Sequence, residues 1–170
     1  ALEAEGVNTF FYILSAPIVA DCLKLGMKGI SVRNETAAGM MAHGYSRATG
    51  KPGWVLSPHG PGTANVVPAL ANAMADACPV INLGASANLR ERGVDVCQEM
   101  DQVAMMRPVT KWAEQATHTH KIPQLVSTAF RHALSPPFGA VYLDMPNDIV
   151  NGGIEDSNWD HPARRSSHYR

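Results

Sequence analysis

The chain lacks an excess of charge of either sign. Its 170 residues include 14 Lys and Arg against 15 Asp and Glu, which gives a net charge of −1. Nucleic acids and anionic membranes attract proteins through basic surfaces, so we expect neither of them as a partner. Long hydrophobic runs are also missing, because none approaches the ~18 residues that a membrane-spanning helix requires. We therefore expect no membrane span.

Cysteine is scarce. The three cysteines, Cys22, Cys78 and Cys97, are odd in number and lack the C-x-x-C spacing of zinc and redox sites. Unpaired thiols are typical of a reducing compartment, which favours the cytoplasm. The histidines form no constellation with Asp, Glu or Cys that indicates a metal site, so we expect no metal ligands in this chain.

Apolar residues, in contrast, make up 45% of the chain, and no internal repeat or low-complexity tract interrupts the sequence. A chain of this length can bury the core of one domain. Short apolar runs alternate along it with amphipathic segments of helical period. Because the short runs are apolar on both sides, the alternation predicts an α/β fold. We expect a three-layer open sheet, mostly parallel, with helices on both faces.

The individual elements follow from the same pattern. Pro68 lies inside one of the expected helices, where it would remove a backbone hydrogen bond, so we expect that helix to be kinked. The expected strands are Thr9–Leu14, Gly29–Val32, Gly53–Ser57, Val80–Gly84, Val109–Ala113 and Ala140–Asp144. The expected helices are Ile18–Leu25, Glu35–Thr49, Thr63–Ala77, Gln102–Met106 and Lys121–Ser135.

The two ends of the sequence differ from its middle. Residues 1–5 are typical of the last turns of a helix, whereas residues 157–170 are polar and have no apolar periodicity, as in a linker. We therefore expect the sequence to belong to a longer protein. It would comprise one folded domain over residues 1–151 and, over residues 152–170, a linker towards a central domain that is not included.

One carboxylate stands where a predicted strand turns into a helix. In the segment Arg-Asn-Glu-Thr-Ala-Ala-Gly, Glu35 follows directly after the strand that ends at Val32. Ligands of open parallel sheets bind beyond the carboxyl ends of the strands. The plainer interpretation is a helix-start carboxylate, favoured by the helix dipole and capped by Asn34. The small apolar turn after Glu35 leaves room for a flat ring, which favours a binding function.

A second motif is predicted at the same edge. The turn Pro-His-Gly-Pro-Gly at 58–62 follows the strand Gly53–Ser57 and leads into Thr-Ala-Asn at 63–65. By itself this is a helix start with proline near the first position. Its place 25 residues after Glu35 makes the combination more specific than either motif.

The string RNETAAGMMAHGYSRATGKPGWVLSPHGPGTAN, which contains both motifs, resembles the pyrimidine-binding (PYR) domain of thiamine-diphosphate enzymes of the acetolactate synthase and benzaldehyde lyase group. The resemblance covers residues 1–151 and implies the thiamine-diphosphate-binding fold and that cofactor. It implies that Glu35 is catalytic, because the matching glutamate hydrogen-bonds N1′ of the aminopyrimidine and relays a proton there. It also implies a cofactor contact for Leu14, Ser15, Pro61 and Asn65.

A third segment, Asp-Val-Cys-Gln-Glu at 95–99, is by itself a polar loop before a helix. It resembles the D-x-F-Q-E segment of acetolactate synthases, and with the Asp-Gln-Val-Ala-Met that follows it resembles benzaldehyde lyase. The resemblance implies that Gln98 contacts the substrate and that Cys97, in place of a bulky apolar residue, widens the pocket. His59 stands where a small hydroxyl residue is usual. It is either a surface turn residue or a group that faces the substrate.

The chain departs from these relatives at several positions. Tyr12 replaces a usual glycine, Pro17 replaces the histidine of benzaldehyde lyase, and Ala85 replaces the pocket glutamine of acetolactate synthases. Asn34 replaces a more usual histidine, as it does in some 2-hydroxyacyl-CoA lyases. The departures at Tyr12, Pro17, His59 and Ala85 keep open an alternative from another class, a non-catalytic α/β assembly domain that has retained the fold, whereas retention of Glu35 argues against it.

The Gly-Asp-Gly motif with which this group binds the diphosphate and Mg²⁺ is absent from the sequence. The resemblance therefore implies a separate PP domain, in the same chain or in a second subunit, within a homodimer or tetramer. We expect the pyrimidine-binding half of a C–C lyase, decarboxylase or carboligase. Its small-molecule substrate would be a 2-keto acid, a 2-hydroxyketone or a 2-hydroxyacyl thioester. An acetolactate-synthase-like enzyme and a 2-hydroxyacyl-CoA or oxalyl-CoA type enzyme remain alternatives.

Overall fold

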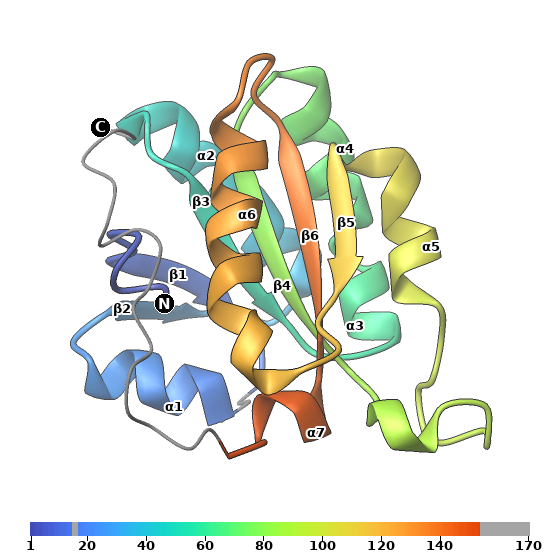
Figure 1. The fold of residues 1–170 in the computed structure, drawn as a ribbon. Coiled ribbons are helices and arrows are strands. Elements are labelled where there is room, and N and C mark those ends of the chain that lie inside the picture. Colours follow the sequence, from blue (N-terminus) through green and yellow to red (C-terminus); the bar gives the residue numbers. More distant parts are fainter. Residues whose placement is uncertain (15–16, 154–170) are drawn as a thin grey trace.

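Six parallel strands form one open sheet in the order β2-β1-β3-β4-β6-β5 (Figure 1). The computed structural model describes residues 1–14 and 17–153, so the predicted contact residue Ser15 and nearly all of the predicted linker lie outside the described residues. The predicted three-layer α/β fold is confirmed, and the sheet is parallel throughout. Its strands are β1 (Thr9–Tyr12), β2 (Lys28–Ser31), β3 (Gly53–Ser57), β4 (Val80–Ser86), β5 (Trp112–Gln115) and β6 (Ala140–Pro146).

Helices cover both faces of this sheet. One face is covered by α1 (Pro17–Lys24) and by α6 (Ile122–Leu134), which lies in front of the strands in Figure 1. The opposite face is covered by α2 (Glu35–Thr49), α4 (Val67–Ala75) and α5 (Gln102–Met106). Shorter elements complete the fold: α3 (Pro61–Ala64), α7 (Asn147–Val150) and the 3₁₀ helices η1 (Leu89–Glu91), η2 (Arg107–Val109) and η3 (Thr119–Lys121).

The apolar core lies in two layers, one on each face of the sheet. On β3, Trp54 and Leu56 belong to the layer beneath α1 and α6, whereas Val55 belongs to the layer beneath α2 and α4. This alternation is the two-residue period of a strand. Because both faces are covered, β3 and β6 are buried along their whole length, which explains why their sequences are apolar on both sides.

Two of the expected elements differ from the structure by more than a shift of one or two residues at an end. The helix expected over Thr63–Ala77 is interrupted after Ala64, and Pro68 lies in the first turn of α4 rather than at a kink. A proline is accepted there because the first amides of a helix have no partner within the helix. The strand expected from Val109 begins only at Trp112, since Val109 ends a 3₁₀ helix.

The amino-terminal residues also differ from the expectation. Residues 2–6 form turns, in which the Glu5 amide donates to the carbonyls of Ala1 and Leu2, both at 3.2 Å, and no helix ends there. None of the helices within residues 1–14 and 17–153 has the length and apolar character needed to span a bilayer.

Candidate functional site

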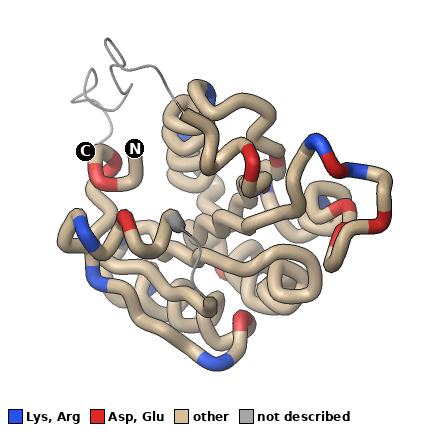
Figure 2. The backbone as a smooth tube through the Cα atoms, turned by 90° about the horizontal axis from the view of Figure 1, so that it is seen from below, with Lys and Arg blue, Asp and Glu red and all other residues tan. Residues whose placement is uncertain are grey.

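The order of the strands reverses between β1 and β3, because β2 lies on one side of β1 and β3 on the other. Ligands of doubly wound sheets bind at such a point, beyond the carboxyl ends of the strands. Figure 2 shows the molecule from this edge, where charged residues of both signs gather in the loop between β4 and α5. The turn at 58–62 directly follows β3 at this edge, and Glu35 begins the helix after β2.

Glu35 is the first residue of α2. The side chain of Asn34 caps this helix by accepting hydrogen bonds from the amides of Thr36 at 2.9 Å and Ala37 at 3.3 Å. The predicted cap is therefore confirmed. The helix dipole stabilises a carboxylate in this position. Glu35 is nevertheless only 9% exposed, so its carboxylate faces protein groups and not mainly solvent.

The Glu35 carboxylate accepts a hydrogen bond from Asn65, the last residue of the second motif. Asn65 Nδ2 donates to Glu35 Oε2 at 3.0 Å, and the Asn65 carbonyl accepts from Thr36 Oγ1 at 2.6 Å. Asn65 caps the carboxyl end of α3, at the interruption between α3 and α4. The interruption between α3 and α4, which the sequence pattern did not predict, thus places the Asn65 amide against the Glu35 carboxylate.

Two glycines of the turn at 58–62 permit close approach. A Cβ on Gly62 would overlap the ring of Pro58 and come within 3.1 Å of Glu35 Oε1. Gly60 has φ 60° and ψ −122°, a conformation open to glycine but strained for other residues, and a Cβ there would lie 2.5 Å from the Gln98 carbonyl oxygen. Pro61 begins α3 between these glycines. The glycines therefore let the turn pack closely against Glu35 and the Gln98 loop.

A cavity of about 350 Å³ opens on the other side of the same turn. His59 and Leu14 line it, together with apolar side chains from the ends of the strands and the amides Asn147 and Asn151. Leu14 is 71% exposed and has φ 56°, a left-handed conformation that leucine rarely adopts and that tends to occur at functional loops. Ala85 lines the cavity, whereas Glu35 and Asn65 do not.

The predicted substrate residues of the third segment lie in an exposed loop. Gln98 has φ 63° and packs its backbone and Cβ against Gly60. Cys97 is a free, exposed thiol. Neither residue lines the 350 Å³ cavity, although Gln98 touches the turn that carries His59. Their contact with substrate stays a prediction.

Sequence reasoning missed a second glutamine, Gln102, at the start of α5. Gln102 is 2% exposed, and its Oε1 accepts a hydrogen bond from the Gly60 amide. Its Nε2 lies 2.7 Å from Asp144 Oδ1, and Asp144 is also buried. A carboxylate within the apolar run Ala-Val-Tyr-Leu-Asp-Met-Pro is a visible sequence signal for such a cluster, but its partners come from distant segments.

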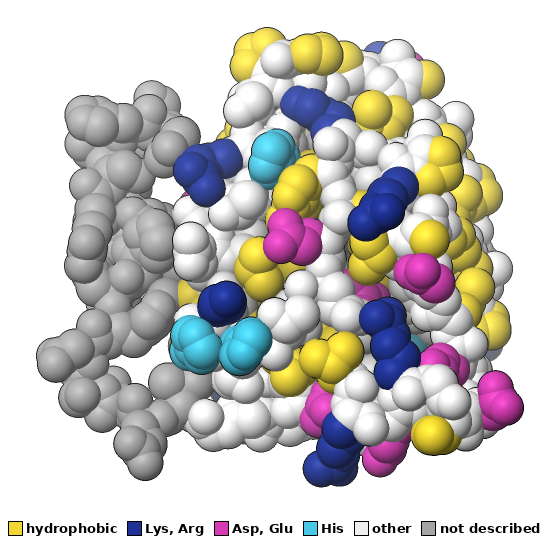
Figure 3. Space-filling model, turned by 45° about the vertical axis from the view of Figure 1, so that its right-hand side comes forward, with side chains coloured by type: hydrophobic (Ala, Val, Ile, Leu, Met, Phe, Trp, Pro, Cys, Tyr) yellow, Lys and Arg dark blue, Asp and Glu magenta, His cyan; other side chains and the backbone are white. Residues whose placement is uncertain are grey.

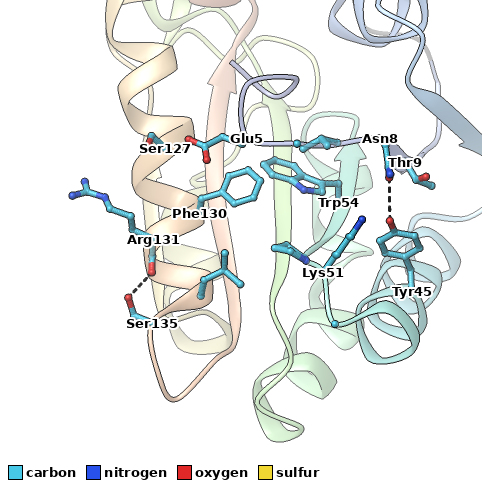
Figure 4. Close-up of a pocket in the computed structure, with 15 residues that line it drawn as sticks. Glu5, Asn8, Thr9, Tyr45, Lys51, Trp54, Ser127, Phe130, Arg131 and Ser135 are labelled. Carbon is cyan, nitrogen blue, oxygen red and sulfur yellow. Dashed lines mark hydrogen bonds between the residues drawn. The ribbon is translucent and has the colours of Figure 1, made fainter. Parts of the chain in front are cut away.

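A larger cavity, of about 450 Å³, lies at the opposite edge of the sheet (Figure 4). Trp54 at the start of β3 and Phe130 on α6 form its apolar wall, with their ring centroids 4.8 Å apart. Burial raises the pKa of Glu5 at its rim, against the smaller effect of the Ser127 hydroxyl beside it. This cavity is remote from the carboxyl ends of the strands and holds none of the predicted site residues.

Among the described residues, no group of three or more His, Cys, Asp or Glu side chains is placed to hold a metal ion. The site at the strand ends therefore offers a buried carboxylate with one oxygen free of hydrogen bonds from the described residues, an amide and a closely packed glycine turn, which suit a ring with polar nitrogens.

Comparison with known proteins identifies the family. The family described as thiamine pyrophosphate enzyme, N-terminal TPP binding domain, matches residues 1–105. The chain belongs to this family. It is 38% identical, over 97% of its length, to the catabolic acetolactate synthase of Raoultella terrigena, of which it covers 30%. It is 32% identical over 94% of its length to the 2-hydroxyacyl-CoA lyase of Arabidopsis thaliana, of which it covers 28%. A probable acetolactate synthase large subunit of Methanocaldococcus jannaschii is 35% identical over 96% of the chain.

This thiamine-pyrophosphate-binding domain thus spans less than a third of the length of these relatives. The predicted family is confirmed, as is the prediction of a thiamine-diphosphate-dependent enzyme domain of the acetolactate synthase and lyase group. The residues present fit the cofactor, because Glu35 Oε1 accepts no hydrogen bond from the described residues and so remains available to a ring nitrogen. When bound, thiamine diphosphate supplies a stabilised carbanion, which the protein has to orient and protonate or deprotonate.

Proposed function

We propose that this chain is the pyrimidine-binding half of a thiamine-diphosphate-dependent C–C lyase, decarboxylase or carboligase. The observation that supports it most directly is the hydrogen bond between Asn65 and Glu35, which joins the two motifs at the carboxyl edge of the sheet. Asn65 occupies one carboxylate oxygen, and the other lies beside Gly62 without a hydrogen bond from the described residues. Glu35 can therefore hold and relay a proton at a ring nitrogen that reaches this oxygen.

The remaining cofactor contacts in the proposal are backbone groups. Leu14 follows β1 and Pro61 follows β3, so their carbonyl groups flank the strand reversal. Ser15, which lies outside the described residues, is included on the resemblance alone. We place the polar ring nitrogens of the cofactor against these groups and Glu35, because backbone amides and carbonyls direct a planar heterocycle without side-chain bulk.

On the substrate side, we propose His59 at the mouth of the 350 Å³ cavity, with Gln98 and Cys97 completing the site from the neighbouring loop. The cavity walls are mainly apolar, and Ala85 adds no polar side chain. Such walls suit the carbon chain of a 2-keto acid, a 2-hydroxyketone or a 2-hydroxyacyl thioester. An acetolactate-synthase-like or 2-hydroxyacyl-CoA lyase activity is the specific alternative, because an acetolactate synthase and a 2-hydroxyacyl-CoA lyase each align with most of the chain.

The partner we propose is a PP domain, of the same chain or of a second subunit, that holds Mg²⁺ and the diphosphate. The outer surface of α2 and α4 suits such a contact. Met40 and Met41 are exposed there, the latter by 47%, and the Asn72 amide lies 3.6 Å from Met40 Sδ across the two helices. This surface is continuous with Glu35 at the start of α2, so we propose that its burial accompanies assembly into a homodimer or tetramer.

The charge pattern of the surface and the free cysteines bear on the partners and the compartment of the protein. Figure 3 shows Lys and Arg interspersed with Asp and Glu on one face, which offers no continuous basic surface for a nucleic acid. Cys22, Cys78 and Cys97 are free thiols, which supports a reducing compartment, and we propose the cytoplasm.

The test is a calorimetric titration of the complete protein with thiamine diphosphate, with and without Mg²⁺, followed by product analysis with pyruvate and with a 2-hydroxyacyl-CoA. We expect Mg²⁺-dependent binding and carbon–carbon bond cleavage or formation with at least one substrate class. Absence of cofactor binding by the complete protein would leave only the assembly-domain alternative.

A further inference from the structure

A buried polar cluster connects the turn at 58–62 to the centre of the sheet. Its centre is Gln102 on α5, and it extends to β4, β5 and β6. Gln102 and Asp144 are 2% and 1% exposed, so their polar atoms depend on protein partners. The other members are Tyr142, Ser86 and Gln115.

The side chain of Gln102 joins three segments. Its Oε1 accepts from the backbone amide of Gly60, in the turn after β3. Its Nε2 lies 2.9 Å from the carbonyl oxygen of Ala85 near the end of β4, and 2.7 Å from both Tyr142 Oη and Asp144 Oδ1 on β6. The turn is therefore tied to two central strands through one amide group.

Asp144 determines the orientation of that amide. A carboxylate can only accept hydrogen bonds, and Asp144 Oδ2 accepts from Ser86 Oγ at 2.8 Å and from Gln115 Nε2 at 2.5 Å. The Tyr142 hydroxyl donates to Oδ1 at 2.6 Å. No Lys, Arg or His of the described segments forms an ion pair with Asp144. Gln102 must therefore present its NH₂ group to Asp144 and its oxygen to Gly60.

The ionisation state of the neighbouring tyrosine supports the same arrangement. Burial raises the pKa of Tyr142 well above its usual range, and the charge of Asp144 and the hydrogen bond to it raise it further. Tyr142 therefore remains a hydroxyl donor at neutral pH, and cannot take the place of Asp144 as the group that orients Gln102.

Gly60 is the point at which this cluster reaches the candidate site. It lies between His59 and Pro61. Glycine can adopt this backbone conformation but does not intrinsically favour it over the others open to glycine. The bond from its amide to Gln102 adds an anchor from outside the turn to the bonds within it, in which Thr63 Oγ1 donates to the Pro58 carbonyl and the Ala64 amide to the Gly60 carbonyl. Because Gly62 packs beside Glu35 two residues later, a shift of the turn changes the surroundings of the carboxylate.

We propose that Gln102 is a positioning residue, which holds the turn at 58–62 in register with Glu35 through the Gly60 amide, and that Asp144 orients Gln102 for this purpose. The catalytic consequence rests on the proposed function, whereas the hydrogen bond to Gly60 does not. The two parts can be measured separately.

The first measurement is the hydrogen exchange rate of the Gly60 amide, followed by NMR on the full chain. Gln102→Met retains the length of the side chain but removes its hydrogen bonds, and should accelerate exchange of Gly60 about tenfold, the equivalent of one lost hydrogen bond. The matched control is Gln124→Met on the exposed side of α6, which should leave Gly60 unchanged. An unchanged Gly60 rate in Gln102→Met overturns the proposal.

A second variant keeps the proposal testable if Gln102→Met does not fold. In Gln102→Glu, a protonated carboxyl group can accept from Gly60 and donate to Asp144, whereas the ionised form has no donor and is repelled by Asp144. Burial and this repulsion raise the pKa of the new carboxyl group. Protection of Gly60 should therefore match the parent at acidic pH and be lost as the pH rises through that raised value.

The ionisable groups in hydrogen-bond contact with Gln102 are Asp144 and Tyr142, both on β6. Asp101, Arg107 and Glu114, on the segments packed around α5, are exposed and should contribute little to this titration. The exchange rate of the Gly60 amide is compared with its intrinsic rate at each pH. If this ratio in Gln102→Glu equals that of the parent at every pH, the hydrogen bond from Gly60 to Gln102 is contradicted.

In the complete enzyme, Gln102→Met should lower turnover at least about tenfold, the equivalent of one displaced hydrogen bond, while the affinity for thiamine diphosphate stays near that of the parent. Gln102→Glu should recover turnover at acidic pH in parallel with Gly60 protection. If Gln102→Met changes Gly60 exchange but leaves turnover unaffected, the positioning role of Gln102 is overturned. A parent protein without thiamine-diphosphate chemistry overturns the proposed function instead, and the exchange result stands independently.

Discussion

The side-chain amide of Asn65 donates a hydrogen bond of 3.0 Å to the carboxylate of Glu35, across 30 residues of sequence. This contact exists because the helix after the turn at 58–62 ends at Ala64 and a new helix begins at Val67. It leaves the other carboxylate oxygen beside Gly62, with no hydrogen bond from the described residues.

Glu35→Gln tests the proton relay. The variant keeps the shape and a hydrogen-bonding group but cannot carry the titratable proton, so the complete enzyme should fold normally and lose roughly 10²–10⁴ in turnover. Exchange of the C2 proton of the cofactor, measured by NMR after acid quench, should slow in parallel. Glu114→Gln on the exposed side of β5 is the matched control. C2 exchange as fast as in the parent would reduce Glu35 to a helix-start carboxylate.

Gly62→Ala tests the close packing of the turn beside Glu35. The added methyl group would overlap Pro58 and approach Glu35 Oε1, so α3 would have to move. We expect a lower melting temperature and, in the complete protein, at least about tenfold weaker binding of thiamine diphosphate, the scale of one lost polar contact. Gly44→Ala in α2 meets no atom within 4 Å and should be neutral or stabilise the chain by about 0.5–1 kcal/mol. Equal melting temperatures for the two variants would contradict the close packing at Gly62.

Gln98→Ala and Cys97→Phe test the substrate loop. In the complete enzyme, Gln98→Ala should reduce turnover and leave cofactor affinity nearly unchanged, because its proposed contact is with substrate. Cys97→Phe should restrict the accepted substrates to smaller 2-keto acids, since it replaces an exposed thiol with a bulky ring. Steady-state kinetics over a series of substrates of increasing chain length provides the measurement. Parent-like behaviour of both variants on every substrate would remove this loop from the site.

Met41→Lys tests the proposed assembly surface on α2 and α4. A lysine in the centre of a buried apolar contact is costly, so the variant should shift the complete protein from dimers or tetramers towards monomers. Analytical ultracentrifugation over a range of concentrations measures the shift. The control is Leu25→Lys, at a residue that is 56% exposed beyond the end of α1. If both variants assemble like the parent, the interface lies elsewhere.

Local chemistry made much of the fold predictable. The start of α2 at Glu35 followed from the Asn34 cap and the dipole, and its end at Thr49 followed from Gly50, which adopts φ 70°. The strand Gly53–Ser57 was predicted with its observed bounds, because a strand buried on both faces reads as an apolar run with a glycine and a proline near its ends. In each case the signal lies within a few residues of the element.

The errors concern segments whose structure depends on distant partners. The helical pattern of Thr63–Ala77 continues through the interruption, and the contacts of Asn65 with Glu35 and Thr36 are what stabilise it. Gln98 was predicted from its motif, and its contact with substrate stays a prediction, whereas Gln102, which the structure buries, was not singled out at all. Burial of a single polar side chain has no periodic signature in the sequence.

By itself, the sequence determined the layers of the fold, the carboxylate at the edge of the sheet and the glycine turn that follows β3, because caps, strand periods and glycine conformations are set by neighbouring residues. The tertiary structure alone decided which groups meet there: Asn65 with Glu35, and Gln102 with Gly60, Tyr142 and Asp144. The physical reason is that these hydrogen bonds join segments brought together by packing of both sheet faces, and their geometry depends on the strand order and on the buried surroundings in which each polar atom must find a partner.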